Sequence, residues 1–235
     1  MSQYKRVLLK LSGEALAGDK GTGFDEATCI LVAKQIQSLT ERNTEVAVVI
    51  GGGNFWRGRT SKTIDRTRAD QIGMMATVMN CIYMSEICRF VGLKTQILTP
   101  FVFGSFTELF SKDRVNEYFS KGMVVFLAGG IGHPYFSTDT ATALRAIEIE
   151  ADVILAARAI DGVYDSDPKL NRDAKKYDTI KMSEVVDQKL GVMDLSAAVL
   201  CMENKVPMMV FGLNEENSIV KAVTGQSKGT LITVD

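Results

Sequence analysis

Several common catalytic devices are absent from the sequence. It contains one histidine, His133, and no G-x-S-x-G motif, which excludes a serine triad of the kind that uses that motif. The four cysteines form no C-x-x-C pair, the spacing that is typical of zinc and redox sites. We therefore expect Cys29, Cys81, Cys88 and Cys201 to be buried thiols of the hydrophobic core.

Long hydrophobic runs and a large net charge are missing as well. The N-terminal residues contain no long apolar segment, and no run approaches the roughly 18 apolar residues of a transmembrane helix. The 27 basic and 28 acidic residues leave a formal net charge of −1, which gives no overall attraction to nucleic acid or to an anionic membrane. We expect a cytoplasmic, soluble protein without nucleic-acid or membrane partners, in which any anion site is local.

The pattern that is present predicts an α/β fold. The 235 residues, 46% of them hydrophobic, suit one large domain or two closely joined lobes. Short apolar runs predict buried parallel strands at 6–11, 46–50, 94–98, 123–128, 152–157 and 207–211, of which 94–98 is the weakest. Helical patterns lie between strands, at 24–42, 138–151 and 194–205. This alternation predicts a three-layer αβα sandwich around a mainly parallel twisted sheet.

Two further segments bear on the organisation of the domain. Residues 72–90 form a helical pattern whose apolar side chains, such as Met75 and Met79, spread over most of the circumference. Such a helix needs burial on more than one side, so it lies either deep in the core or against another subunit. If the chain has a second lobe, the polar segment 164–180 is the best place for it to begin.

The predicted strands end in residues that suit a phosphate. In open α/β sheets, ligands collect at the carboxyl ends of the strands. Four strands continue into LSGEAL, IGGGNFWRGR, LAGGIGHPYFSTDT and ARAIDGVYDSDP. Glycines let backbone N–H groups approach an anion, and a helix that starts near Ser137 and Thr138 favours negative charge at the same edge. Basic residues follow the second strand at Arg57, Arg59, Lys62, Arg66 and Arg68.

Each of these strand ends has an ordinary explanation when it is taken alone. Three glycines are most often a tight turn, and Thr138 followed by Asp139 is a common helix start. Lys10 is harder to explain in this way, because it interrupts an apolar strand and a buried lysine is costly unless an anion or a carboxylate meets it. The four strand ends together predict a site for a polyanion.

Two familiar phosphate-binding motifs do not fit. Gly18 and Gly23 have the spacing of a P-loop, but Phe24 stands where that motif requires lysine. Gly51 and Gly53 begin a dinucleotide-binding fingerprint, but Trp56 occupies its third glycine position. The phosphate site is therefore of another kind.

The absence of a nucleophile–base pair fits phosphoryl transfer, which depends mainly on positioning and positive charge. If the acceptor is itself a phosphate, its second pKa is about 6, so the attacking oxygen is largely ionised at neutral pH. Such a reaction needs no general base, but it needs cationic groups between two polyanions. Lys10, Arg57 and helix N-termini are the groups that could supply this charge.

Seven segments resemble the motifs of one family and occur in its order. They are LLKLSGEAL, VVIGGGNFWRG, ADQIGMMATVMN, GHPYFSTDTATALRAIEIEADVIL, DGVYDSDP, VMDLSAA and GTLI. Over essentially its whole length the chain resembles the bacterial uridylate kinase (UMP kinase) family of the amino acid kinase superfamily. The resemblance implies transfer of a phosphoryl group from ATP with Mg²⁺ to UMP, giving UDP and ADP in pyrimidine nucleotide biosynthesis. It also implies an allosteric homohexamer with GTP and UTP as effectors.

The resemblance further implies one amino acid kinase-like domain over residues 1–235, with an acceptor part at roughly 1–150 and an ATP part at roughly 151–235. The implied catalytic residues are Lys10, Arg57, Asp139 and Asp194. The implied UMP-binding residues are Gly52, Asp70, Ile131, Gly132, His133, Pro134, Tyr135, Phe136, Ser137 and Thr138. The implied ATP-binding residues are Lys10, Leu11, Ser12, Gly13, Gly53, Arg57, Arg158, Tyr164 and Asp167. No protein metal site is implied.

Three residues depart from the family pattern. The family often has Thr-Gly-Asn-Pro where this chain has Ile131, Gly132, His133 and Pro134, so contacts to the base through those side chains are in question. Arg158 stands before the DGVY turn, where a lysine is common. Whether GTP activates this protein is also an open question.

Two alternative functions remain open on the sequence. A non-catalytic storage or regulatory protein that binds nucleotides or oxyanions would use the same fold, but it would not need Asp70 and the acceptor segment 131–138. A superfamily kinase that phosphorylates a carboxylate or a carbamate would leave Asp70 without a ribose to contact.

Overall fold

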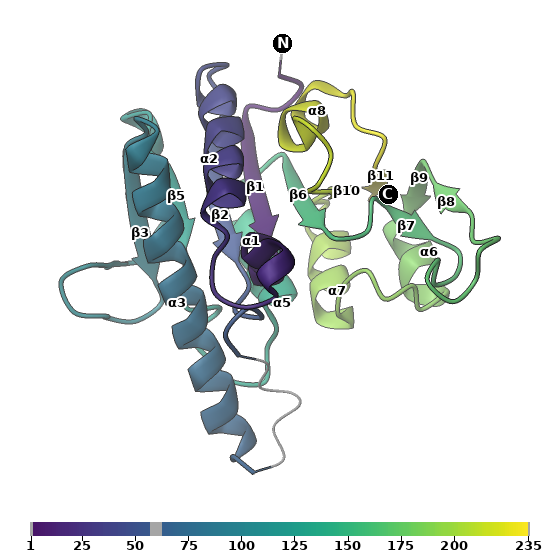
Figure 1. Ribbon diagram of the computed structural model, residues 1–235, viewed down its shortest axis with the longest axis horizontal. Coiled ribbons are helices and arrows are strands. Elements are labelled where there is room, and N and C mark those ends of the chain that lie inside the picture. The colour runs from purple at the N-terminus through teal and green to yellow at the C-terminus, as the bar shows by residue number, and fades with distance from the viewer. Residues whose placement is uncertain (1, 57–62, 235) are drawn as a thin grey trace.

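A nine-stranded sheet forms the centre of the molecule within residues 2–56 and 63–234, which are the residues that the computed structural model describes (Figure 1). The strand order is β4-β3-β5-β2-β1-β6-β10-β11-β9, and every neighbouring pair is parallel except β10 and β11. The strands are β1 Arg6–Leu11, β2 Glu45–Ile50, β3 Thr95–Thr99, β4 Glu108–Leu109, β5 Val124–Leu127, β6 Val153–Arg158, β9 Thr179–Lys181, β10 Met208–Gly212 and β11 Thr230–Thr233. The chain thus has the predicted mainly parallel sheet.

Helices cover both faces of this sheet (Figure 1). The helices are α1 Gly13–Ala17, α2 Glu26–Thr40, α3 Arg66–Phe90, α4 Lys112–Ser120, α5 Thr138–Glu148, α6 Met182–Asp187, α7 Leu195–Glu203 and α8 Ser218–Thr224, with a 3-10 turn, η1, at Gly18–Lys20. A separate hairpin pairs β7 Val163–Tyr164 with β8 Lys176–Tyr177. The architecture is the expected αβα sandwich.

The alternation of side chains along β1 determines which layer each residue reaches. Val7 and Leu9 belong to the core formed with α2, α3 and α8. Leu8 belongs to the opposite core, formed with α4, α5, α6 and α7. Because successive side chains of a strand point to opposite faces, Lys10 lies on the Leu8 face, where α5 begins. This placement creates the charged centre described below.

All six predicted strands are present, as β1, β2, β3, β5, β6 and β10, with ends within one residue of the prediction. The predicted helices correspond to α2, α5 and α7, and Asp25 caps α2 by accepting the N–H of Thr28 at 2.8 Å. The prediction for 72–90 begins too late, because α3 starts at Arg66 behind the cap residue Asp65. Its first turns carry arginines rather than apolar side chains, so the hydrophobic pattern does not mark them.

One face of α3 is buried and the other is open. Val78, Cys81 and Met84 are at most 3% exposed, whereas Met75 and Met79 are 49% and 48% exposed. The helix therefore does not lie deep in the core of the chain. Of the two alternatives for its apolar circumference, contact with another subunit is the one that remains, as a prediction.

All four cysteines are free and buried, as expected. Burial raises the pKa of Cys29, Cys81, Cys88 and Cys201 to about 12, so these thiols stay protonated and unreactive at neutral pH. Across the described ranges, no helix has the length and apolar character that crossing a membrane requires.

Candidate active site

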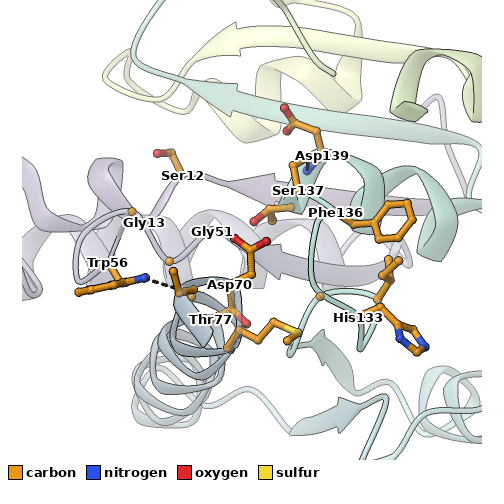
Figure 2. Close-up of a pocket in the computed structure, with 18 of the residues that line it drawn as sticks. Ser12, Gly13, Gly51, Trp56, Asp70, Thr77, His133, Phe136, Ser137 and Asp139 are labelled. Carbon is orange, nitrogen blue, oxygen red and sulfur yellow. Dashed lines mark hydrogen bonds between the residues drawn. The ribbon is translucent and has the colours of Figure 1, made fainter. Parts of the chain in front are cut away.

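A cavity of about 300 Å³ opens at the carboxyl ends of β1 and β2, beside the start of α5 (Figure 2). It brings together residues that the sequence analysis selected from distant segments. Those that line it are Lys10, Ser12, Gly13, Gly52, Gly53, Asp70, Ile131, His133, Phe136, Ser137, Thr138 and Asp139. Gly132 lines a neighbouring cleft, and Leu11 is buried in the core. Pro134 and Tyr135 belong to the same loop without lining the cavity.

Several residues that line this cavity were not predicted from the sequence. Trp56 lines it and donates an indole hydrogen bond to the carbonyl of Ala69 at 2.7 Å. Gly73, Met74 and Thr77 of α3 line it too. With Asp70 these three follow the i, i+3, i+4, i+7 spacing of one helix face. That spacing was the signal that would have identified them.

A second cavity, of about 520 Å³, lies at the end of β6 and around the β7–β8 hairpin. It contains Arg158, Tyr164 and Asp167, three of the residues assigned to ATP. Its walls are partly apolar, formed by Ile160, Val163, Leu190, Val192 and Val210. An apolar slot with a charged end suits the base and the phosphates of a nucleotide.

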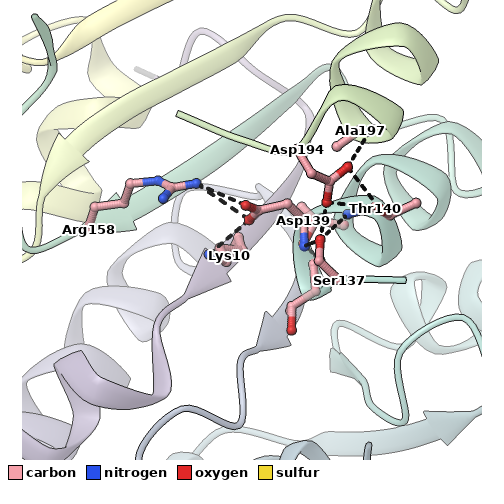
Figure 3. A network of polar contacts seen from close by, with 9 residues as sticks. Lys10, Ser137, Asp139, Thr140, Arg158, Asp194 and Ala197 are labelled. Atoms are coloured by element: carbon pink, nitrogen blue, oxygen red, sulfur yellow. Dashed lines mark hydrogen bonds and ion pairs between the residues drawn. The ribbon is translucent and has the colours of Figure 1, made fainter. Parts of the chain in front are cut away.

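Two cations and one carboxylate lie close together, with Lys10 and Asp139 from the lining of the first cavity and Arg158 from that of the second (Figure 3). Lys10 Nζ lies 3.0 Å from Asp139 Oδ1, and the Arg158 Nη2 atom lies 3.4 Å from both Asp139 oxygens. Lys10 is 9% exposed, and the Asp139 carboxylate is the partner that a buried ammonium group was predicted to need. Two positive charges against one negative charge leave this group with a formal charge of +1.

The same contacts set the ionisation of Asp139. Burial raises the pKa of this carboxyl group, but the charges of Lys10 and Arg158 outweigh that effect and hold the pKa below its ordinary value. Asp139 is therefore ionised at neutral pH. The buried Nε of Arg158 has no hydrogen-bond acceptor among the described residues, which leaves a donor for an incoming anion.

Hydrogen bonds hold the turn after β2, and its backbone lies close to α3. The N–H of Gly51 donates to the carbonyl of Leu11 at 3.0 Å, and the carbonyl of Gly52 accepts from both Phe55 and Trp56 at 3.0 Å. A Cβ on Gly52 would come within 2.9 Å of the carbonyl oxygen of Gly73. Only glycine therefore fits this position without displacing α3.

Ser137 is the N-cap of α5 and accepts hydrogen bonds from the N–H groups of Asp139 and Thr140 at 3.0 and 3.3 Å. Thr138 is the first residue of the helix and lines the cavity. The N-terminus of α5, with its partial positive charge, therefore faces the same space as Lys10.

Asp194 is the N-cap of α7 and makes polar contacts that differ from those of Asp139. It accepts from the N–H of Ala197 at 2.8 Å and from the hydroxyl groups of Thr140 at 3.0 Å and of Ser137 (Figure 3). Lys10 and Arg158 pair with Asp139 instead. A role of Asp194 in organising the cations thus stays a prediction, and its observed contacts hold α5 against α7.

Asp70 connects α3 to the loop before α5. It accepts from Arg66 Nε at 2.8 Å and from the backbone N–H of Tyr135 at 2.8 Å. Tyr135 has a φ of 72°, a conformation that costs a non-glycine residue energy and that this hydrogen bond helps to hold. The loop carries His133, whose side chain is exposed at the edge of the cavity.

The predicted basic cluster lies partly outside the described residues. Arg57, Arg59 and Lys62 belong to residues 57–62, so their assigned roles stay predictions. Arg66 pairs with Asp70, and Arg68 lies in the first turn of the same helix, with its Nη1 at 2.9 Å from Gln71 Oε1. Within the described ranges, no group of three or more His, Cys, Asp and Glu residues could hold a metal ion.

Comparisons with known proteins identify the family. The sequence matches the amino acid kinase family over residues 5–212. The solved structure of UMP kinase from Bacillus anthracis is 36% identical, has a TM-score of 0.94, and the match covers 99% of this chain and 97% of that one. UMP kinase from Ureaplasma parvum is 33% identical at a TM-score of 0.93, with 98% and 99% covered. Uridylate kinase from Archaeoglobus fulgidus is 29% identical at a TM-score of 0.76, with 99% and 100% covered. The chain belongs to the amino acid kinase family, and UMP kinases match it from end to end.

Proposed function

We propose that the chain is an ATP-dependent UMP kinase, which converts UMP and ATP to UDP and ADP. The observation that carries this proposal is the group formed by Lys10, Asp139 and Arg158 between two cavities. It presents excess positive charge where two nucleotide phosphates would meet. The structures that match the chain over its whole length are named as kinases of this type.

The reaction needs no proton acceptor on the protein. An ionised oxygen of the UMP phosphate forms a bond to the γ-phosphorus of ATP, while the bond from that phosphorus to the bridging oxygen breaks. ADP leaves with the electron pair. Lys10 would neutralise the charge of the transferred group, and the N-terminus of α5 would stabilise the phosphate oxygens on the acceptor side.

The ATP side would use the second cavity. Its apolar walls would hold the adenine, and Tyr164 and Asp167 would contact the nucleoside, as the family resemblance implies. Asp161 fixes this region, because its carboxylate accepts from the hydroxyl of Tyr164 and from Lys176 Nζ, both at 2.7 Å. Arg158 would direct its unused Nε at the ATP phosphates.

The acceptor side would use the first cavity. Gly52 and the loop 131–138 would enclose UMP, and Asp70 would meet its ribose after exchanging one of its present partners. Mg²⁺ would enter as the ATP complex, where it needs few protein ligands because phosphate oxygens and water fill most of its coordination sphere. When it is bound there, it neutralises part of the phosphate charge.

We also propose a homohexamer in the cytoplasm, regulated by GTP and UTP and serving pyrimidine nucleotide biosynthesis. The exposed methionine face of α3 supports self-association, and four free thiols fit a reducing compartment. The effectors and the number of subunits rest on the family resemblance.

Release of ADP from purified protein with ATP and Mg²⁺ tests the activity, with UMP, CMP, AMP and carbamate offered separately as acceptors. Turnover with UMP well above the other acceptors is the expected result. Similar rates with UMP and CMP would show that the loop with Ile131 and His133 does not read the base. ATP binding without turnover of any acceptor would instead support the non-catalytic nucleotide-binding alternative.

A further inference from the structure

Two buried amide side chains hold the glycine turn after β2. Asn80, on α3, is fully buried, and Asn54, in the turn, is 3% exposed. The Nδ2 atom of Asn80 donates to Asn54 Oδ1 at 2.8 Å, and the Nδ2 atom of Asn54 donates back to Asn80 Oδ1 at 3.0 Å. Each nitrogen has a second acceptor, which is the carbonyl of Gly51 at 2.6 Å for Asn80 and the carbonyl of Gly23 at 2.8 Å for Asn54.

This pattern requires an amide at each position. The two backbone carbonyls only accept hydrogen bonds, so each side-chain nitrogen must face its carbonyl and each oxygen must face the partner amide. An ionised carboxylate has no donor for either contact. The pair also packs tightly, because a Cβ on Gly13 would collide with Asn54 and with the carbonyl of Gly51. The geometry of the turn and of the start of α1 is therefore fixed from inside.

The contact to Gly51 determines where the next N–H group points. In a planar trans peptide the carbonyl and the following N–H point in opposite directions. Since Asn80 binds the carbonyl of Gly51, the N–H of Gly52 points away from Asn80. The carbonyl of Gly52 likewise accepts hydrogen bonds, from Phe55 and Trp56. These contacts set the direction of the N–H of Gly53 in the same way.

The N–H groups of Gly52 and Gly53 have no backbone acceptor in the part of the chain that the structure describes. Both glycines line the cavity that Lys10 and the N-terminus of α5 also face. Two neighbouring N–H groups without a backbone acceptor, in a cavity that also contains Lys10 and the N-terminus of α5, form a nest suited to phosphate oxygens.

We propose that Asn80 is a positioning residue for phosphate binding, which acts by aiming the N–H groups of Gly52 and Gly53 into the cavity. Asn54 holds Asn80 in the required orientation and connects the turn to the segment around Gly23. The inference rests on the proposed function for the identity of the ligands. The family resemblance assigns Gly52 to UMP and Gly53 to ATP, and the test below follows the phosphate of UMP. It adds a residue outside the cavity that determines how tightly that phosphate is bound.

Replacement of the amide tests this role, with Asn80→Ala and Asn80→Asp as variants and Ser85→Ala as the matched control. Ser85 lies on the same helix, is 1% exposed and shares a hydrogen bond of 2.8 Å with Thr95, away from the turn. UMP affinity is measured through the fluorescence of Trp56, the one tryptophan of the chain, which lines the cavity. KM for UMP, kcat and the melting temperature are measured on the same preparations.

We expect the dissociation constant and the KM for UMP to rise by roughly tenfold or more in both Asn80 variants, as loss of a hydrogen bond to a charged group predicts. The Ser85→Ala values should stay within about twofold of the wild type, although both positions lose a buried hydrogen bond. Asn54→Ala, which leaves the contact from Asn80 to Gly51, should weaken UMP binding less than Asn80→Ala.

Two results would overturn the inference. One is a folded Asn80→Ala protein with wild-type UMP affinity and KM. The other is a loss of melting temperature in the Asn80 variants with no change in UMP binding, since a purely structural residue behaves in that way. If the wild type turns over no UMP, the proposed function fails, and the same variants are then compared in their binding of inorganic phosphate.

Discussion

Lys10 adds to a positive charge that the Asp139 carboxylate only partly balances, which favours a bound phosphate. It is 9% exposed, belongs to a central strand and shares Asp139 with a second cation. A methionine at this position keeps most of the volume and removes the charge. We expect Lys10→Met to lower kcat by about 100-fold or more, equivalent to roughly 2.7 kcal/mol of transition-state stabilisation. UMP affinity should change much less, because the backbone groups of the turn remain.

Lys112→Met is the control for this substitution. Lys112 pairs with Glu150 at 2.7 Å, but both side chains are exposed and neither lines either cavity. Exposed ion pairs contribute little to stability. Single-turnover rates for both variants check the prediction, and an unchanged rate for Lys10→Met would remove this lysine from the catalytic group.

The ionisation of Asp139 predicts how the unfolding free energy depends on pH. Its pKa in the folded protein lies below the ordinary value of about 3.9 that applies to the unfolded chain. A depressed carboxyl pKa adds stability that is fully present above the unfolded pKa and is lost as pH falls through the folded pKa. We therefore expect the unfolding free energy of the wild type to fall more steeply below about pH 4 than that of Asp139→Asn.

Urea denaturation between pH 2.5 and 7 measures this difference, with Asp139→Asn compared to the wild type at each pH. The two proteins should approach each other in stability toward the acid end of the range. A constant difference across the whole range would show that the Lys10 and Arg158 contacts do not depress the pKa of Asp139.

At the scale of elements, the junction of α5 and α7 places the cavity-lining end of α5. Asp194 caps α7 and also binds the hydroxyl groups of Ser137 and Thr140 at the start of α5. We expect Asp194→Ala to lower the unfolding free energy by about 1–3 kcal/mol, from loss of the cap and of the buried hydroxyl contacts. Thermal and chemical denaturation measure this loss.

The conservative variant Asp194→Asn separates two roles of this residue. It keeps an oxygen for the N–H of Ala197 but removes the negative charge. If Asp194 acts by holding α5, Asp194→Asn should retain most of the activity. A loss of kcat as large as that of Lys10→Met would support the role in organising the cations that the family resemblance implies.

How well an element could be predicted from the sequence depends on its hydrophobic pattern. Central strands such as β1 and β6 are buried on both faces and form continuous apolar runs, so their ends were predicted closely. α4 was not predicted, because only Val115, Tyr118 and Phe119 of its nine residues are buried. The two-residue strands β4 and β7 give no pattern at all.

The residues of the candidate site were likewise predictable only where the sequence carries a visible signal. Lys10 was predicted because a charged side chain interrupts an otherwise apolar strand. Asp139 is the carboxylate that pairs with it. Thr77 was missed because an uncharged residue within a helix gives little sign of function. Its hydroxyl accepts the N–H of Gly129 at 2.9 Å, a contact between segments 52 residues apart that only the fold brings together.

At the scale of the whole molecule, the exposed apolar face of α3 has no role that a single chain explains. Ile72, Met75 and Met79 are 40%, 49% and 48% exposed, although they extend the apolar pattern of a helix whose other side is buried. Full burial of a fully exposed side chain of this kind contributes about 1.5–3 kcal/mol, and these half-buried side chains would gain roughly half of that each. A homo-oligomer that buries this face on every subunit would gain that contribution at each copy.

We expect the double variant Met75→Lys and Met79→Lys to shift the protein toward smaller species, because association would bury two charges. Sedimentation velocity of both proteins at equal concentration measures the change. The control is Leu31→Lys, at a residue of α2 that is 62% exposed and lies on a different helix. Wild-type protein that sediments as a single 25.7-kDa chain would refute the proposed assembly, and an unchanged oligomer in the double variant would place the interface elsewhere.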